Sequence, residues 1–533
     1  MTEVHNDTES AILQDKVKRL RQAIYQQKPI LGEVLGVENV AIEQFYTKFH
    51  EDSPKETIQT REDYINIVSE ETSALLGSEI GEKMRIRLEK SSAITTAHHL
   101  AIDFTPSTVQ GSIVASLMED HDSVIPIFAC GAVPADNVLH PLGPTIARER
   151  SNPTGNKTEE GKDITKVSRI GFNVISRAYK HTAVSALPSF NESQVKGALT
   201  QLMGYDARKG EQILYKEQQA LKKIYEEVYL NPNVLNKKTY SEQVTVANNL
   251  LFKMLFSEDL RNQIPEMVYL EDEKIVSRVL QQDLKNQDSL VYRILFDPKL
   301  RNIVVKKLNG VPGCWNLNNE NETTFLFWGL DGKNNRLIKI GLAGTDNHLA
   351  LTGANLEDIP FTPNGLSRAL QDKRLIPATF MSFVTHVFAR GMKAYGGYFQ
   401  TDYLTQIKEG LIVSLVEGSY KTWAELISKV PTKNYLCGSE PIMVRYADDT
   451  VKPAGPVEIV AKGGLTIEDY QKLNKMSVQT ANSVAYPNIY RVVSPIAEQD
   501  PDLLSVTRED LVAKHKGELI EISFKPTSNK RKK

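Results

Sequence analysis

The first ninety residues carry apolar and charged positions at the spacing of an α-helix. Leu13, Val17 and Leu20 share one face of such a helix, and lysine and arginine residues fall between them. The segment DYINIVSEETSALLG repeats the pattern and ends at Gly77, a residue type that commonly terminates helices. The pattern predicts a helical segment over residues 1–90, which would form an N-terminal helical cap.

After Lys90 the pattern becomes that of strands alternating with helices. A β-prone run, SAITTA, leads into a polar loop with two histidines, and STVQGSIVASLMED then has helical spacing. The continuous apolar run SVIPIFACG follows, as expected for a strand buried on both faces. Strand, helix and strand in this order predict a βαβ unit. We therefore expect a Rossmann-like, mainly parallel sheet core that begins near Ser91 and occupies residues 91–188.

The sequence after residue 188 predicts a different organisation. From Ser189 to about Pro298 the spacing is mostly helical with long charged faces, which indicates a large helical insertion over residues 189–300. Residues 301–533 mix both periods and predict a C-terminal α/β portion. Within it, two β-rich arms flank Asp331-Gly332, a sequence typical of a hairpin turn.

Composition and charge limit the classes of partner that this α/β protein is expected to bind. The chain of 533 residues has a net charge of −2, so it has no overall charge that would attract nucleic acid or an anionic membrane. Its three cysteines are too few for a disulfide framework and form no CxxC metal signature. The start lacks a signal-peptide pattern, and the apolar stretch Ala378–Met392 is shorter than a membrane-spanning helix. We expect a cytoplasmic protein with a small-molecule substrate; the composition indicates neither a cofactor nor an oligomeric state.

Candidate chemistry gathers after the first predicted strand. The order His98-His99-x-x-x-Asp103 stands where strand gives way to loop, and open α/β folds bind ligands at that edge of the sheet. The helix expected to start near Ser107 would direct its N–H groups at the same loop. His99 is then the predicted catalytic base, His98 its partner or a substrate contact, and Asp103 the orienting carboxylate. Simple packing of the two rings is the competing interpretation.

Two family resemblances rest on this segment. HHLAID resembles the HHxxxD core of the nonribosomal-peptide condensation and chloramphenicol acetyltransferase enzymes, which implies that His99 is the base and Asp103 structural; Phe104 replaces the usual glycine. The order TTAHHLAIDFTP, VQGSIVASL and SVIPIFACG is similar in layout to the bacillithiol cysteine-ligase family. That resemblance implies a Rossmann-like pocket for a nucleotide or substrate, with His98 and His99 in place of paired glutamines.

Further polar residues are candidates for substrate binding because they follow predicted strands or lie in loops that could cover the site. They are Cys130, Asn137, His140, Arg148, Gln400 and Asp402. A metal site is the alternative use of the histidines, with His98, His99, Asp103 and His121 as ligands. The sequence contains no GxxxxGK[ST], GxGxxG, HExxH or GxSxG motif, which disfavours the enzyme classes that depend on them.

These patterns predict an enzyme that acts on small molecules. An acyl or aminoacyl transferase or an amide-forming ligase, using the His-His-x-x-x-Asp site without a metal, is the favoured hypothesis. A metal-dependent hydrolase and a noncatalytic binding or scaffold protein remain the alternatives.

Overall fold

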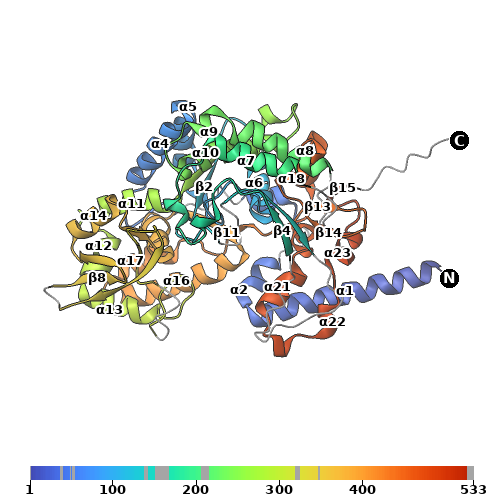
Figure 1. Ribbon diagram of the computed structural model, residues 1–533. Coiled ribbons are helices and arrows are strands. Elements are labelled where there is room, and N and C mark those ends of the chain that lie inside the picture. The colour runs from blue at the N-terminus through green and yellow to red at the C-terminus, as the bar shows by residue number, and fades with distance from the viewer. Residues whose placement is uncertain are drawn as a thin grey trace.

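The computed structural model describes most of the chain (Figure 1). The described residues are 2–36, 40–47, 50, 54–136, 142–149, 167–205, 215–317, 324–345 and 348–524. Of residues 2–10, 145–149 and 167–170 only the backbone is described. In this part of the chain, helices and strands form a mixed α/β structure with a five-stranded parallel sheet.

The N-terminal segment is helical, as its spacing predicts. It contains α1 (Thr2–Gln27), α2 (Pro29–Leu35), α3 (Ile42–Thr47), α4 (Glu62–Leu76) and α5 (Ser78–Lys90). The predicted apolar face of α1 is buried at Val17, Leu20 and Ile24. Gly77 ends α4 with a φ of 100°, a conformation that glycine adopts without strain.

The parallel sheet lies at the centre of the molecule. Its strands are β1 (Ala93–Thr95), β2 (Val124–Ala129), β5 (Glu266–Glu271), β11 (Lys393–Gly397) and β12 (Tyr435–Cys437). They are arranged in the order β12-β11-β1-β2-β5, and every neighbouring pair is parallel. The predicted βαβ unit is confirmed as β1, α6 (Pro106–Ser116) and β2.

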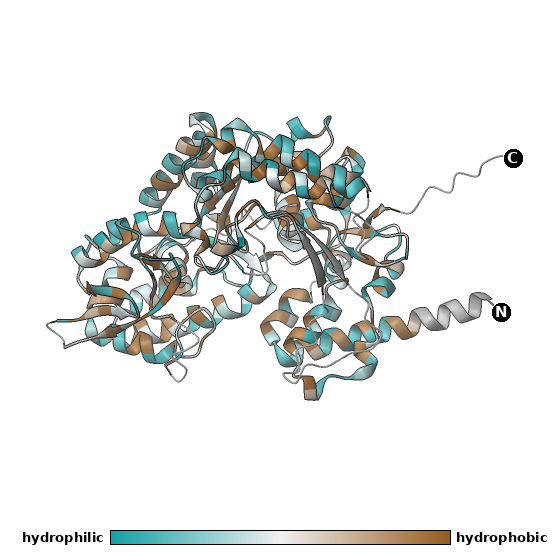
Figure 2. Ribbon diagram, viewed as in Figure 1, coloured by the Kyte–Doolittle hydropathy of each residue, from teal (hydrophilic) through white to brown (hydrophobic). Residues whose placement is uncertain are grey.

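Alternate residues of β2 serve two separate cores. Ile125 and Ile127 of β2 pack in one core with α6 and α10 (Tyr240–Met254), while Val124 and Phe128 pack in another with α4, α5 and α11 (Asp272–Asp283). This two-residue period is what extended backbone imposes, and it leaves both faces of the sheet covered by helices. Figure 2 shows hydrophobic and hydrophilic residues alternating along α4 and α5, as expected when one face of a helix is buried.

The predicted helical insertion is interrupted by a strand of the central sheet. It begins with α7 (Glu192–Met203), α8 (Tyr215–Ile224), the π-helical turn η4 (Tyr225–Tyr229), α9 (Pro232–Leu235) and α10. Six residues of β5 follow and pair with β2 from Val124 to Ala129. Helices α11, α12 (Leu290–Phe296) and α13 (Pro298–Lys307) then complete the segment. Part of the expected insertion therefore belongs to the sheet itself.

A second, antiparallel sheet follows in the order β10-β6-β7-β8-β9. Its strands are β6 (Phe327–Leu330), β7 (Leu337–Ala343), β8 (Ala350–Gly353), β9 (Leu356–Pro360) and β10 (Leu375–Pro377). Strands β6 and β7 form the predicted hairpin around Asp331-Gly332. The neighbouring helices are α14 (Pro363–Gln371), α15 (Thr379–Ser382), the π-helical turn η6 (Phe383–Phe388), α16 (Tyr398–Glu417) and α17 (Lys421–Ser428).

The C-terminal elements return to the start of the chain. A small sheet consists of β13 (Ile442–Arg445), β14 (Val451–Pro453) and β15 (Ile520–Ser523). Six helices lie between β14 and β15 in the chain: α18 (Pro456–Lys462), α19 (Ile467–Lys475), α20 (Val478–Ser483), α21 (Tyr486–Val493), α22 (Pro501–Leu504) and α23 (Arg508–Lys514). Helices α21 and α22 pack against α1 (Figure 1). Arg19 of α1 forms ion pairs with Asp500 and Asp502 that secure this contact. A separate hairpin pairs β3 (Thr145–Glu149) with β4 (Val167–Gly171).

Candidate functional site

A cavity of about 620 Å³ opens at the carboxyl ends of the parallel strands. All five strands contribute residues at or just beyond those ends: Thr96, His98 and His99 after β1, Cys130 after β2, Asp272 and Glu273 after β5, Gly397 and Gln400 at β11, and Cys437 and Gly438 at β12. The volume is within the range of small-molecule binding sites. The order of the strands also reverses at this place: β2 and β5 follow β1 on one side, whereas β11 and β12, which come later in the chain, lie on its other side. Open α/β sheets bind ligands at such a reversal.

Backbone pairing holds the two histidines beside this reversal. The Cys130 amide donates to the His98 carbonyl at 2.8 Å, and the Leu100 amide donates to the Cys130 carbonyl at 2.8 Å. These bonds continue the parallel pairing of β1 and β2 beyond the ends of both strands. The Tyr269 hydroxyl donates to the His99 carbonyl at 2.5 Å and fixes the loop from the side of β5.

His98 is buried between the sheet and α6. Its Nε2 lies 3.0 Å from the Ser112 hydroxyl, which donates its own proton to the Thr108 carbonyl. The ring therefore carries its proton on Nε2 and donates it to Ser112, which leaves the Nδ1 lone pair as an acceptor. Burial lowers the pKa of His98 to about 3, so the ring is neutral at physiological pH.

Asp103 lies next to His98 and shapes the loop before α6. Its Oδ2 is 3.7 Å from His98 Nε2, and its Oδ1 accepts the Thr105 amide at 2.9 Å. The Asn248 side chain of α10 accepts the Asp103 amide at 2.8 Å. Burial raises the pKa of Asp103 to about 6, and hydrogen bonds from Thr108 and Thr105 oppose that rise. The carboxylate predicted to orient His99 thus lies beside His98 instead.

His99 has the ring with fewer protein contacts. Its Nδ1 is buried and has no hydrogen-bond partner among the described residues, and burial lowers the pKa of the ring. A neutral imidazole that lines a cavity is a ready acceptor for a substrate proton.

Cys130 faces a carboxylate that the sequence interpretation missed. Its Sγ lies 3.1 Å from Glu273 Oε1, and the same carboxylate accepts the Gly131 amide at 2.7 Å and the Ala132 amide at 2.9 Å. Burial and the neighbouring carboxylate of Asp272 raise the pKa of Glu273 to about 8. Burial and Glu273 raise the pKa of the Cys130 thiol well above its usual value. Cys130 is therefore a hydrogen-bond donor here rather than a thiolate nucleophile.

A third histidine lines the cavity near Asp272. His386 belongs to the π-helical turn η6 and is 1% exposed. Its Nδ1 lies 3.6 Å from Asp272 Oδ1. The sequence analysis used neither residue, although an acidic triplet directly after the apolar run MVYL is the same strand-to-loop signal that singled out His98.

Gln400 is at the cavity, as predicted, whereas Asp402 is elsewhere. The Gln400 amide donates to Thr96 Oγ1 at 2.7 Å and so joins the ends of β11 and β1. Gly396 makes room for it, because a Cβ at Gly396 would lie 2.1 Å from Gln400 side-chain atoms. Asp402 is two residues further along α16, which turns its side chain about 200° around the helix axis. There it pairs with Lys28 at 2.7 Å and does not line the cavity.

The other predicted site residues lie either outside the described part of the chain or, in the case of His121, away from the cavity. Asn137 and His140 lie outside the described residues, as does the side chain of Arg148 in β3. His121 is exposed in the turn before β2, at the opposite end of that strand from His98. The four ligands of the metal hypothesis are therefore not assembled. Within the described ranges, no group of three or more His, Cys, Asp or Glu side chains is placed to hold a metal ion.

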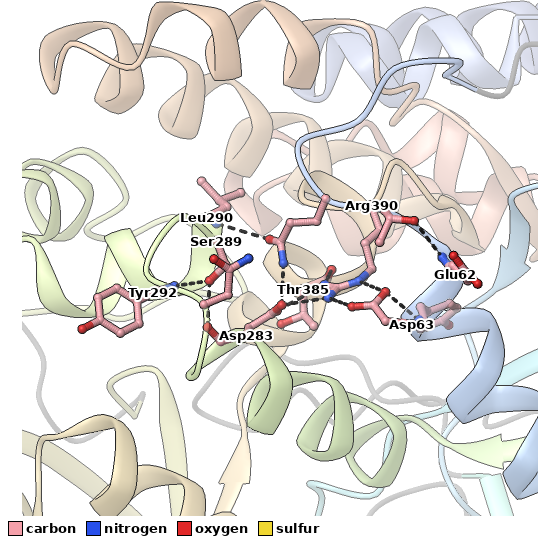
Figure 3. Close-up of polar contacts among 12 residues, drawn as sticks. Glu62, Asp63, Asp283, Ser289, Leu290, Tyr292, Thr385 and Arg390 are labelled. Carbon is pink, nitrogen blue, oxygen red and sulfur yellow. Dashed lines mark hydrogen bonds and ion pairs between the residues drawn. The ribbon is translucent and has the colours of Figure 1, made fainter.

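Arg390 fixes the elements that carry Asp272 and His386 (Figure 3). Its guanidinium is fully buried and bonds to Asp63 of α4 at 2.6 Å and to Asp283 of α11 at 2.8 Å. It also donates to the Thr385 carbonyl within η6 at 2.9 Å. One cation thus joins α4, α11 and η6 behind the cavity, where pairing with two carboxylates offsets its burial.

Comparisons with models of protein families, with curated proteins and with solved structures found no significant match for this chain. No helix of the described part is both long and apolar enough to cross a membrane.

Proposed function

We propose that the chain is an enzyme that transfers an acyl or aminoacyl group to the amine of a small molecule, as a transferase or an amide-forming ligase. The chemistry of the cavity carries the proposal. Its described lining includes His98, His99 and His386 together with Asp272 and Glu273, and it includes no lysine or arginine. The Asp272 carboxylate favours a cationic ligand, and neutral imidazoles accept protons, which are the two properties that a site for an amine nucleophile needs.

The proposed roles divide between the two sides of β1. His99 removes a proton from the nitrogen that attacks the acyl carbon, because it is neutral and its Nδ1 has no hydrogen-bond partner among the described residues. His98 and Asp103 hold the loop that presents His99, through their contacts with Ser112 and Thr105. Gln400 is proposed to donate a hydrogen bond to the substrate, because its bond to Thr96 uses only one of its two amide protons. Cys130, whose thiol proton goes to Glu273, is proposed to contact the substrate through its sulfur from the other side of β1.

We further propose a Rossmann-like core with an N-terminal helical cap over residues 1–90, of which α4 and α5 share a buried core with the sheet. The five strands, numbered in chain order, stand as 3-2-1-4-5 across the sheet, the order found in doubly wound nucleotide-binding folds. This supports the pocket for a nucleotide or substrate that the layout shared with the bacillithiol cysteine-ligase family implies. The three cysteines form no disulfide, which agrees with the proposed cytoplasmic location.

The test begins with ligands. Thermal unfolding of the full chain is measured with nucleotides, amino acids and acyl-coenzyme A esters, since a bound ligand stabilises the folded state. The stabilising combinations are then incubated with enzyme, and amide products are sought by mass spectrometry. Stabilisation by an acyl donor together with an amine, followed by amide formation, is the expected result.

Variants then connect product formation with the cavity. The double variant His98→Ala/His99→Ala should lose about 10²–10⁴-fold in rate, the usual contribution of general base catalysis. His348→Ala removes an exposed histidine of the antiparallel sheet and should change nothing. Full activity in a folded double variant would contradict the proposal, as would a complete lack of stabilisation by every ligand class.

A further inference from the structure

His386 and Asp272 form a histidine–carboxylate pair on the sheet face opposite α6. Asp272 begins α11 and His386 lies in η6, and both line the cavity. The His386 ring packs edge-on against Tyr64 with centroids 6.2 Å apart, and Tyr64 in turn contacts Phe128 of β2. The pair is therefore separate from the His98–Asp103 pair, which lies on the α6 side.

The polar atoms of this pair are buried without hydrogen bonds. His386 Nδ1 and Nε2, Asp272 Oδ1 and the Tyr64 hydroxyl all have no partner among the described residues. Buried polar atoms nearly always have partners, because an unpaired one destabilises the folded state. Because His386 and Asp272 line the cavity, their unpaired atoms indicate that a ligand supplies the missing partners.

The charge at this place selects the kind of ligand. Asp272 forms no ion pair with a lysine or arginine of the described residues, and Glu271 and Glu273 flank it in the chain. Arg390 is nearby, but Asp63 and Asp283 already neutralise it. A buried carboxylate without a cation is unfavourable, so a cationic group is the ligand that this end of the cavity fits.

We propose that His386 and Asp272 form the subsite that binds the primary ammonium group of the substrate. The ammonium group donates hydrogen bonds to Asp272 Oδ1 and to the lone pair of a His386 ring nitrogen. This inference rests on the proposed function, since it places the amine of the amide-forming reaction. It assigns to His386 a binding role and leaves the proton transfer to His99.

The first experiment needs no knowledge of the natural substrate. Asp272→Asn and His386→Leu are made in the full chain, and thermal unfolding of the free protein is measured. If these groups await a ligand, removing their unpaired atoms should raise the melting temperature by about 1–3 °C. Gln110→Leu is the matched control: Gln110 is equally buried, but its amide bonds to the Ile442 and Ala454 carbonyls, so its loss should lower the melting temperature.

The second measurement tests the class of ligand. Methylammonium, propylammonium and cyclohexylammonium chlorides are compared with potassium chloride at the same ionic strength. The wild type should be stabilised more by at least one primary ammonium salt than by potassium, and Asp272→Asn should lose that difference.

Each outcome bears on the inference. If His386→Leu and Asp272→Asn destabilise the protein as Gln110→Leu does, the pair is structural and the inference is wrong. If they stabilise it but no ammonium salt exceeds potassium, the assignment of the ligand as an amine is wrong. Ammonium binding without amide formation from any acyl donor would contradict the proposed reaction and still support the subsite.

Discussion

The Glu273 carboxylate accepts a hydrogen bond from the Cys130 thiol and two more from the backbone amides of Gly131 and Ala132. A single carboxylate at the end of β5 thereby clamps the first three residues after β2. This arrangement brings two neighbouring strands into register at the cavity. Cys130 stays protonated, because burial and, in addition, the negative charge of Glu273 raise the pKa of the thiol.

Glu273→Gln should make Cys130 more reactive. Removing the charge lowers the pKa of the thiol, so a larger fraction is thiolate at a given pH. Alkylation by iodoacetamide at pH 8, followed by peptide mass spectrometry, should show faster labelling of Cys130 than in the wild type. Cys314, which is buried and does not line this cavity, serves as the internal control. Equal labelling rates in the two proteins would argue against an electrostatic effect of Glu273 on the thiol.

The same substitution should change how stability depends on pH. The folded state raises the pKa of Glu273 from 4.5 to about 8, so it favours the protonated form. The resulting stabilisation is fully present below pH 4.5 and is lost as the pH rises through about 8. Urea unfolding between pH 7 and pH 9 should show a smaller decline for Glu273→Gln than for the wild type, by at most about 1.4 kcal/mol per pH unit. Glu425→Gln, at an exposed position, should follow the wild type.

Arg390→Met should destabilise the protein strongly. It leaves the carboxylates of Asp63 and Asp283 without their shared cation, and breaking a buried ion pair in this way costs about 3–5 kcal/mol. Chemical denaturation measures the loss. Arg368→Met removes an exposed arginine of α14 and should stay within about 0.5 kcal/mol of the wild type. A loss at position 390 no larger than this control would show that the pairs contribute little.

Gly396→Ala should disturb the end of β11 through Gln400. The new methyl group overlaps the Gln400 side chain, which must move and release Thr96. Overpacking of this kind destabilises by about 1–3 kcal/mol. Truncation in the double variant Gly396→Ala/Gln400→Ala should recover part of the loss, and a double-mutant cycle measures the coupling. Gly341→Ala, where a Cβ meets no atom within 4 Å, is the control. Additive losses at positions 396 and 400 would exclude the proposed overlap.

Local pattern was sufficient to predict the elements whose residues are close in sequence. The βαβ unit from Ala93 to Ala129 and the hairpin around Asp331 follow from periodicity and turn residues. Strand β5 was missed because its six residues lie between long helices and its partner β2 is about 140 residues earlier. Nothing local distinguishes such a short apolar run from part of a helix.

Some residues of the candidate site could be predicted from local sequence, and others could not. His98, His99 and Cys130 belong to one βαβ unit, so their proximity could be inferred from the sequence. Asp272 and His386 reach the cavity only because β5 and β11 join the sheet on either side of that unit, and strand order is a tertiary property. The sequence also could not show that Asp103 lies by His98 instead of His99, since that depends on how the loop folds back onto α6.

The pairing of Ala93 with Lys393 has a consequence for biosynthesis. Strand β1 is made early, but its neighbour on one side follows 300 residues later. During translation the β1 edge therefore waits without its partner while the intervening chain is synthesised, and unpaired strand edges promote misassembly. The ribosome must deliver nearly the whole polypeptide before the cavity can close, so we expect nascent chains that stop before β11 to aggregate or to depend on chaperones.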